Sequence, residues 1–148
     1  LNNMGSDITP EFKDYSLAVD FLADAIRKDH FNSVGRMTRA LRLEYYALVK
    51  RILCERRQVI PCYAGIASAQ IAPNGDVWMC CVKAEPVGNL REVGYDFSRI
   101  WLSERAKSIR QRIRNGDCYC PLANATYTNM LYHLRTLSRV AWNMITMR

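Results

Sequence analysis

The sequence predicts an α+β fold, in which a small β-hairpin is flanked by helices. The helices are predicted by apolar residues that recur every three or four positions over much of the chain. The hairpin is predicted by Pro73-Asn74-Gly75, which separates two short runs of strand-like sequence. Proline presets φ, asparagine tolerates a turn and glycine supplies φ > 0, so this tripeptide favours a tight turn.

Two helices are expected before the hairpin. The first begins at Thr9-Pro10-Glu11, because a hydroxyl cap, a proline at the first helical position and an early acid favour a helix start. Asn32 or Ser33 is expected to cap the second helix, which ends near Arg57. Helical spacing predicts one buried face on each, formed by Ala18, Phe21, Leu22, Ala25 and Ile26 on the first and by Val34, Met37, Leu41, Tyr45, Leu48 and Ile52 on the second.

The hairpin is expected to end in two adjacent cysteines. Its strands cover residues 67–72 and 76–81, and alternation along the second strand places Cys80 and Cys81 on opposite faces. Trp78 shares the face of Cys80 and is expected to shield it from water.

Further helices are expected after the hairpin. Gly88-Asn89-Leu90 is expected to form another turn, and Asp96 and Ser103 cap two helical segments. The helix after Ser103 is expected to bury Leu102, Ala106, Ile109 and Ile113. A single last helix starts near Asn124 and is expected to bury Tyr127, Met130, Leu131, Leu134, Leu137, Ala141 and Ile145.

The composition indicates a soluble globular domain. Hydrophobic residues make up 49% and charged residues 24% of 148 residues, which excludes a mainly disordered chain. No apolar stretch approaches the roughly 18 residues that a membrane crossing needs. The chain shows no export signal and no initiator methionine at its first position, so we expect a piece of a longer cytoplasmic protein without a membrane segment. The net charge of +7 permits, without establishing, an acidic or nucleic-acid partner.

Five of the six cysteines are spaced as metal ligands often are, while Cys54 is expected to be a packing residue. The predicted hairpin brings Cys62 toward Cys80, and the pair Cys118 and Cys120 follows a helix end. These four thiolates could form a tetrahedral shell for zinc or an iron–sulfur cluster, and spacing alone does not choose between the two. Cys81 stays an alternative to Cys80.

A series of motifs resembles one known family. Cys62-Tyr-Ala-Gly65, Ile71-Ala-Pro-Asn-Gly75-Asp-Val77, Cys80, Gly88-Asn-Leu90 and Ile100-Trp101 occur in the order seen in SPASM domains. These are the C-terminal auxiliary-cluster domains of radical S-adenosylmethionine (SAM) enzymes, and their C-x(9–15)-G-x(4)-C signature is met by Cys62, Gly75 and Cys80. The resemblance extends from about Ile60 to Asn124.

The resemblance implies a division of the chain and one cofactor. Residues 1–59 would be a helical barrel tail and linker, residues 60–124 the cluster domain and residues 125–148 a C-terminal helix. A full SPASM domain continues with C-x2-C-x5-C-x3-C, whereas this chain offers only Cys118 and Cys120. It therefore resembles the shorter "twitch" domains, which implies a single 4Fe–4S cluster.

The resemblance also implies a missing partner. The catalytic C-x3-C-x2-C motif of radical SAM enzymes does not occur here, so the chain is not expected to be active alone and contains no predicted catalytic residue. The implied partner is an N-terminal radical SAM barrel, which would bind S-adenosylmethionine and make an oxidoreductase or maturase that acts on a peptide or protein.

The alternative prediction is a structural zinc module with a basic surface for nucleic acid or an acidic partner. Its basic residues would lie on one helix, and they are Arg105, Lys107, Arg110, Arg112 and Arg114. Nucleic acid is the less favoured partner, because no aromatic residues alternate with these side chains as stacking platforms.

Overall fold

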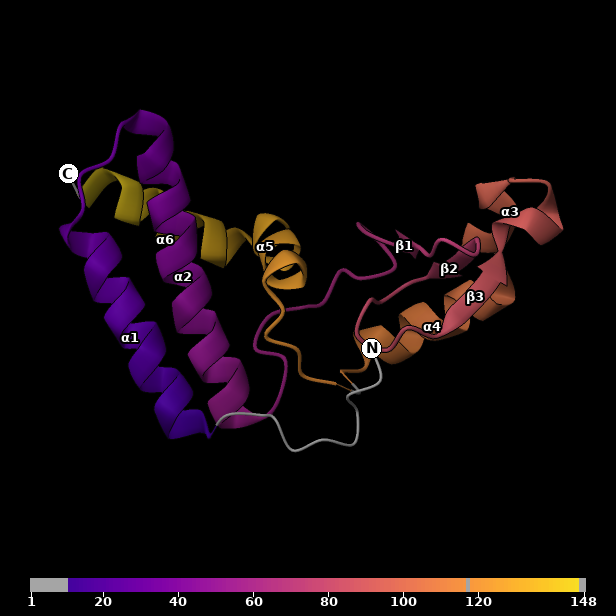
Figure 1. Cartoon of the computed structure of the whole chain (residues 1–148), viewed down its shortest axis with the longest axis horizontal. Helices are drawn as coiled ribbons and strands as arrows, with labels where there is room; N and C mark the ends of the chain where they lie inside the picture. The colour runs from indigo at the N-terminus through magenta and orange to yellow at the C-terminus, as the bar shows by residue number, and fades with distance from the viewer. Residues whose placement is uncertain (1–10, 117, 147–148) are drawn as a thin grey trace.

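The computed structural model describes residues 11–116 and 118–146, which form two halves (Figure 1). Within these residues, one half contains the helices α1 (Phe12–Lys28), α2 (Ser33–Glu55), α5 (Ala123–Leu131) and α6 (Leu134–Thr146). The other half contains the strands β1 (Gln70–Ile71), β2 (Asp76–Trp78) and β3 (Pro86–Asn89), the 3₁₀ helix η1 (Leu90–Val93), and the helices α3 (Phe97–Trp101) and α4 (Glu104–Arg114). The predicted α+β class is confirmed.

Each half has its own apolar core. The buried residues of the helical core are Ala40, Leu48, Ile60, Met130 and Val140. Those of the sheet core are Ala64, Val77, Met79, Val87, Leu90, Ile100, Ala106, Ile109 and Ile113. The chain passes from the helical core to the sheet core within residues 60–64 and returns within residues 113–130. The first connection contains Cys62 and the second contains Cys118 and Cys120.

Helix α1 buries a different face from the predicted one. Val19 and Ala23 are buried, whereas the side chains of Phe21 and Leu22 are 74% and 45% exposed. The helix packs on α2, and the small Val19 and Ala23 side chains allow a close approach. The predicted cap at Thr9-Pro10 lies outside the described residues. None of the helices in the described ranges combines the length and the apolar character that a membrane crossing requires.

Helix α2 begins as predicted. The side chain of Asn32 accepts a hydrogen bond from the backbone N–H of Gly35 at 2.8 Å, which caps the helix. Leu48 and Ile52 are buried as expected, but the predicted face is wrong at Val34 and Met37, which are exposed. The first buried residue of α2 is Arg39, so both apolar side chains of its first turns stay exposed.

The predicted hairpin turn is confirmed, with shorter strands than expected. Gly75 has φ +93°, and its N–H donates to the carbonyl oxygen of Ala72 at 2.9 Å. Strand β1 pairs antiparallel with β2 in the register Gln70↔Trp78. Beyond that pair the chain leaves the sheet, so the second strand ends at Trp78 rather than at residue 81.

Strand β3 was not predicted, and the sheet has the order β1-β2-β3. The predicted turn at residues 88–90 is wrong, because Gly88 and Asn89 belong to β3 and Leu90 starts η1. Proline and glycine disfavour strands. Here Gly88 allows close packing, since a Cβ at this position would lie 3.2 Å from the Cγ1 atom of Ile100.

The two caps after the sheet are confirmed. Asp96 accepts from the backbone N–H of Ser98 at 3.0 Å, and Ser103 accepts from that of Ala106 at 3.1 Å. Three members of the predicted stripe on α4 are buried, whereas Leu102 precedes the helix and is 67% exposed.

The predicted last helix is divided into α5 and α6. His133 lies at the break, where its ring nitrogen Nδ1 lies 2.8 Å from Oγ1 of Thr136 in the first turn of α6. Neither proline nor glycine marks the break, so the sequence pattern could not reveal it. Met130 is buried as predicted, but Leu134 is 82% exposed.

Candidate metal centre

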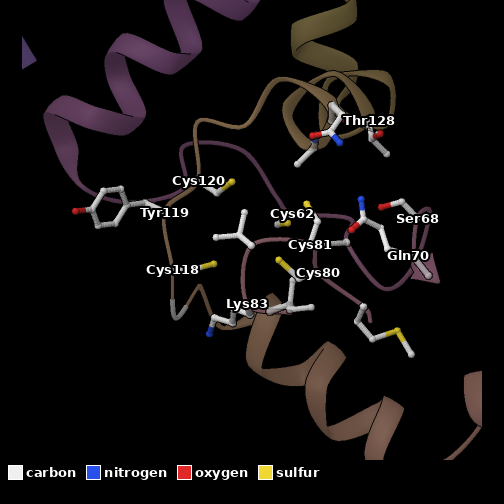
Figure 2. A pocket seen from close by; sticks show the side chains of 17 residues that line it. Cys62, Ser68, Gln70, Cys80, Cys81, Lys83, Cys118, Tyr119, Cys120 and Thr128 are labelled. Atoms are coloured by element: carbon white, nitrogen blue, oxygen red, sulfur yellow. Dashed lines mark hydrogen bonds between the residues drawn. The ribbon is translucent and has the colours of Figure 1, made fainter. Parts of the chain in front are cut away.

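Five cysteines line one cavity of about 160 Å³ (Figure 2). They are Cys62, Cys80, Cys81, Cys118 and Cys120. All four predicted ligands are therefore at the same cavity, together with the predicted alternative. The six cysteines of the chain are free thiols, and the sixth, Cys54, is exposed on α2 rather than packed as predicted.

Cys62 is positioned by contacts on its C-terminal side. The backbone N–H of Tyr63 donates to Oδ1 of Asn129 on α5 at 2.8 Å. Two residues further, the carbonyl oxygen of Gly65 accepts from Nε of Arg110 on α4 at 2.6 Å. Gly65 has φ +76°, a conformation that favours glycine. The loop that carries Cys62 is thus held by one helix from each half of the molecule.

Cys80 and Cys81 both line the cavity, so their predicted placement on opposite faces is wrong. Alternation applies only within a strand, and β2 ends at Trp78. A turn follows in which the N–H of Ala84 donates to the carbonyl oxygen of Cys80 at 3.0 Å. Trp78 does not line this cavity.

Cys118 and Cys120 lie in the segment that connects α4 to α5. The backbone N–H of Leu122 donates to Sγ of Cys120 at 3.4 Å. The hydroxyl of Tyr45 on α2 donates to the carbonyl oxygen of Pro121 at 3.0 Å. These contacts hold the segment against the helical half.

The remaining lining residues come from both halves. Buried Met79 and Ile113 belong to the sheet core, and α5 lies across the other side of the cavity (Figure 2). The polar lining residues were not predicted, and they are Ser68, Gln70, Lys83, Tyr119, Asn124 and Thr128. No local pattern distinguishes these residues, because only the fold brings them to the cysteines.

Two of the thiols have raised pKa values. Burial raises the pKa of Cys120. The hydrogen bond from the N–H of Leu122 lowers this pKa in part, and the charges of Cys80, Cys118 and Cys81 raise it. Burial also raises the pKa of Cys81, with smaller contributions from Cys80 and Cys62. The protonated form is therefore favoured, and a metal that binds these sulfurs has to displace protons.

The donor set is chemically suited to an iron–sulfur cluster or to zinc. Both bind thiolate sulfur, and five thiols line the cavity. As the side chains stand in the described part of the chain, no three His, Cys, Asp or Glu residues are grouped closely enough to hold one metal ion.

The basic residues of α4 are partly engaged within the chain. Arg112 pairs with Glu85 at 2.8 Å, and Lys107 pairs with Glu104 at 2.6 Å. Arg110 donates to the carbonyl oxygen of Gly65, and its guanidinium carbon lies 4.5 Å from the ring centroid of a tryptophan on α3. Three of the five basic side chains therefore have partners within the chain.

The comparisons with known proteins agree with the cavity. Residues 62–121 match the family model of SPASM, described as an iron–sulfur cluster-binding domain. This match covers less than half of the chain and spans all five lining cysteines. Searches of curated proteins and of solved structures gave no match. Iron–sulfur chemistry is thus the class of site that the family match supports.

Proposed function

We propose that residues 62–121 hold one 4Fe–4S cluster, with Cys62, Cys80, Cys118 and Cys120 as its ligands. The observation that carries this proposal is the convergence of these thiols on one cavity of about 160 Å³. The match to an iron–sulfur cluster-binding domain supports it independently of the cavity. Thiolate sulfur is also the donor that such clusters require.

The surroundings suit a cluster that carries electrons or supports the fold. Met79 and Ile113 cover the cavity on the side of the sheet core, which keeps part of it away from water. An N–H donor faces Sγ of Cys120. Solvent exposure and hydrogen bonds to sulfur are two of the factors that set the reduction potential of an iron–sulfur cluster. When bound, the cluster would supply one-electron transfer.

The proposal extends to an enzyme setting. We propose that the chain serves as an accessory domain of a radical SAM enzyme that modifies a peptide or protein in the cytoplasm, where thiols stay reduced. The support is the order of the motif elements from Cys62 to Ile100-Trp101. Because no C-x3-C-x2-C motif occurs here, S-adenosylmethionine would be bound by the partner barrel, and this chain would not catalyse alone.

Counting iron, sulfide and zinc on one anaerobically purified sample tests the cluster. We expect about four irons and about four sulfides per chain, with the brown absorption of such clusters. One zinc with no sulfide would contradict the proposal in favour of a zinc module, and no metal after reconstitution would also contradict it.

A matched pair of variants tests the ligands. Cys62→Ala and Cys54→Ala each remove one thiol, but only Cys62 lines the cavity. We expect Cys62→Ala to lose iron and sulfide together, whereas Cys54→Ala keeps both. Full iron content in Cys62→Ala would show that this residue is not a ligand.

A further inference from the structure

We propose that Cys81 is a reserve ligand, able to replace Cys80 at one iron of the cluster. This inference rests on the proposed cluster function and adds a fifth residue to its site. A cluster with one thiolate on each of four irons uses four cysteines, whereas five line the cavity.

The turn after β2 places the two neighbouring thiols together. The strand ends at Trp78, and the turn is closed by the hydrogen bond from the N–H of Ala84 to the carbonyl oxygen of Cys80. Ala84, where the turn ends, has φ +47°. Figure 2 shows Cys80 and Cys81 at the same cavity with the other labelled cysteines. The two thiols therefore leave the same turn and line the same cavity.

The two cysteines differ in their support. Cys80 packs against the sheet core, as Cys62 does. Cys81 lines the cavity without belonging to that packed set, and the next residue, Val82, is 46% exposed. Cys80 is therefore the better-held ligand and Cys81 the more adjustable one.

The replacement is balanced without a redox reagent. With a cluster bound, the thiol of Cys81 would release its proton to solvent as it became a ligand, and the sulfur of Cys80 would take up a proton as it left. No electron would be gained or lost. In a variant without Cys80, the thiol of Cys81 would serve as the fourth ligand.

Cys62 has no such substitute. Its neighbours in the chain are Pro61 and Tyr63, and the thiol nearest in the sequence, that of Cys54, is exposed on α2 and does not line the cavity. The proposal therefore predicts unequal effects of removing single cysteines. Cys62→Ala should lose the cluster, whereas Cys80→Ala should keep it.

The experiment compares Cys80→Ala, Cys81→Ala and the double variant, with Cys54→Ala as the control. We expect both single variants to keep iron and sulfide within about a fifth of the control, and the double variant to lose at least four fifths of each. Electron paramagnetic resonance of the reduced cluster adds a second measurement. Its g-values should shift in Cys80→Ala, where the ligand has changed, and stay unchanged in Cys81→Ala.

Each other outcome overturns a defined part of the argument. Loss of the cluster in either single variant, or its retention in the double variant, overturns the reserve-ligand proposal while the cluster function stands. A control protein that binds no iron overturns the cluster function itself. Far-UV circular dichroism checks the fold. If the double variant unfolds, Cys80→Val combined with Cys81→Ala keeps an apolar side chain of similar size at the packed position and supplies no donor atom.

Discussion

Replacing Asn129 by alanine tests how the two halves are joined beside the cavity. Asn129 lies on α5 with 2% of its surface exposed, and its Oδ1 accepts the backbone N–H of Tyr63 at 2.8 Å. Tyr63 follows Cys62 directly, so this hydrogen bond fixes the loop that carries a proposed ligand. The variant leaves that N–H without its acceptor in a partly buried position.

The expected loss of stability follows from this unmet donor. A buried polar group without a hydrogen-bond partner costs about 1–3 kcal/mol, and the partial burial of this bond favours the lower half of that range. We therefore expect the free energy of unfolding to fall by about 1–2 kcal/mol. For a chain of this size, the midpoint of thermal unfolding should fall by about 2–4 °C for each kcal/mol.

Urea unfolding followed by circular dichroism measures this change. Arg135→Ala on α6 is the control, because Arg135 is exposed, does not line the cavity, and surface substitutions usually change stability by less than about 0.5 kcal/mol. Equal stability of Asn129→Ala and Arg135→Ala would refute the argument that this contact fixes the Cys62 loop. The iron content of Asn129→Ala, measured in parallel, should fall below that of the control.

Three further changes test the turn, α4 and the helical half. Gly75→Ala should destabilise the protein by about 1 kcal/mol more than Gly94→Ala in urea unfolding. Both glycines have positive φ, but a Cβ at Gly75 would lie 2.9 Å from Oδ1 of Asn89, whereas a Cβ at Gly94 would meet no atom within 4 Å. Arg110→Met should cost about 2–3 kcal/mol in the same assay, since it leaves two carbonyl oxygens without their donor, whereas exposed Arg105→Met should change little. Burial raises the pKa of Tyr45 to about 12, with smaller contributions from neighbouring tyrosine charges. The stability that the protonated side chain contributes is therefore complete below pH 10 and is lost as the pH rises toward 12. Tyr45→Phe should therefore lose less stability than the parent protein over that interval; an equal loss would contradict the raised pKa.

Local signals in the sequence predicted local structure well. The turn at Pro73-Asn74-Gly75 and the caps at Asn32, Asp96 and Ser103 depend on neighbours within three residues, and all are confirmed. The buried face of α1 is set by its packing on α2, which no local pattern encodes. Because apolar residues occur on more than one side of α1, spacing alone selected the wrong stripe.

The sequence predicted that the cysteines lie together, but only part of their geometry. Spacing and resemblance grouped four cysteines that all line one cavity in the structure, and their role as ligands stays a prediction. The relation of Cys80 to Cys81 was wrong because the end of β2 depends on pairing with β3, whose Pro86 and Gly88 give no strand signal. The contact between Tyr63 and Asn129 joins residues 66 apart, and sequence spacing does not predict such a pair.

The two connections between the cores have a mechanical consequence. Cys62 lies on the outgoing connection, and Cys118 and Cys120 lie on the returning one, so a group bound to all three would close the sheet half into a ring. Closing so long a loop lowers the entropy of the unfolded chain. Loss of the cluster would remove this constraint and so lower the free energy of unfolding.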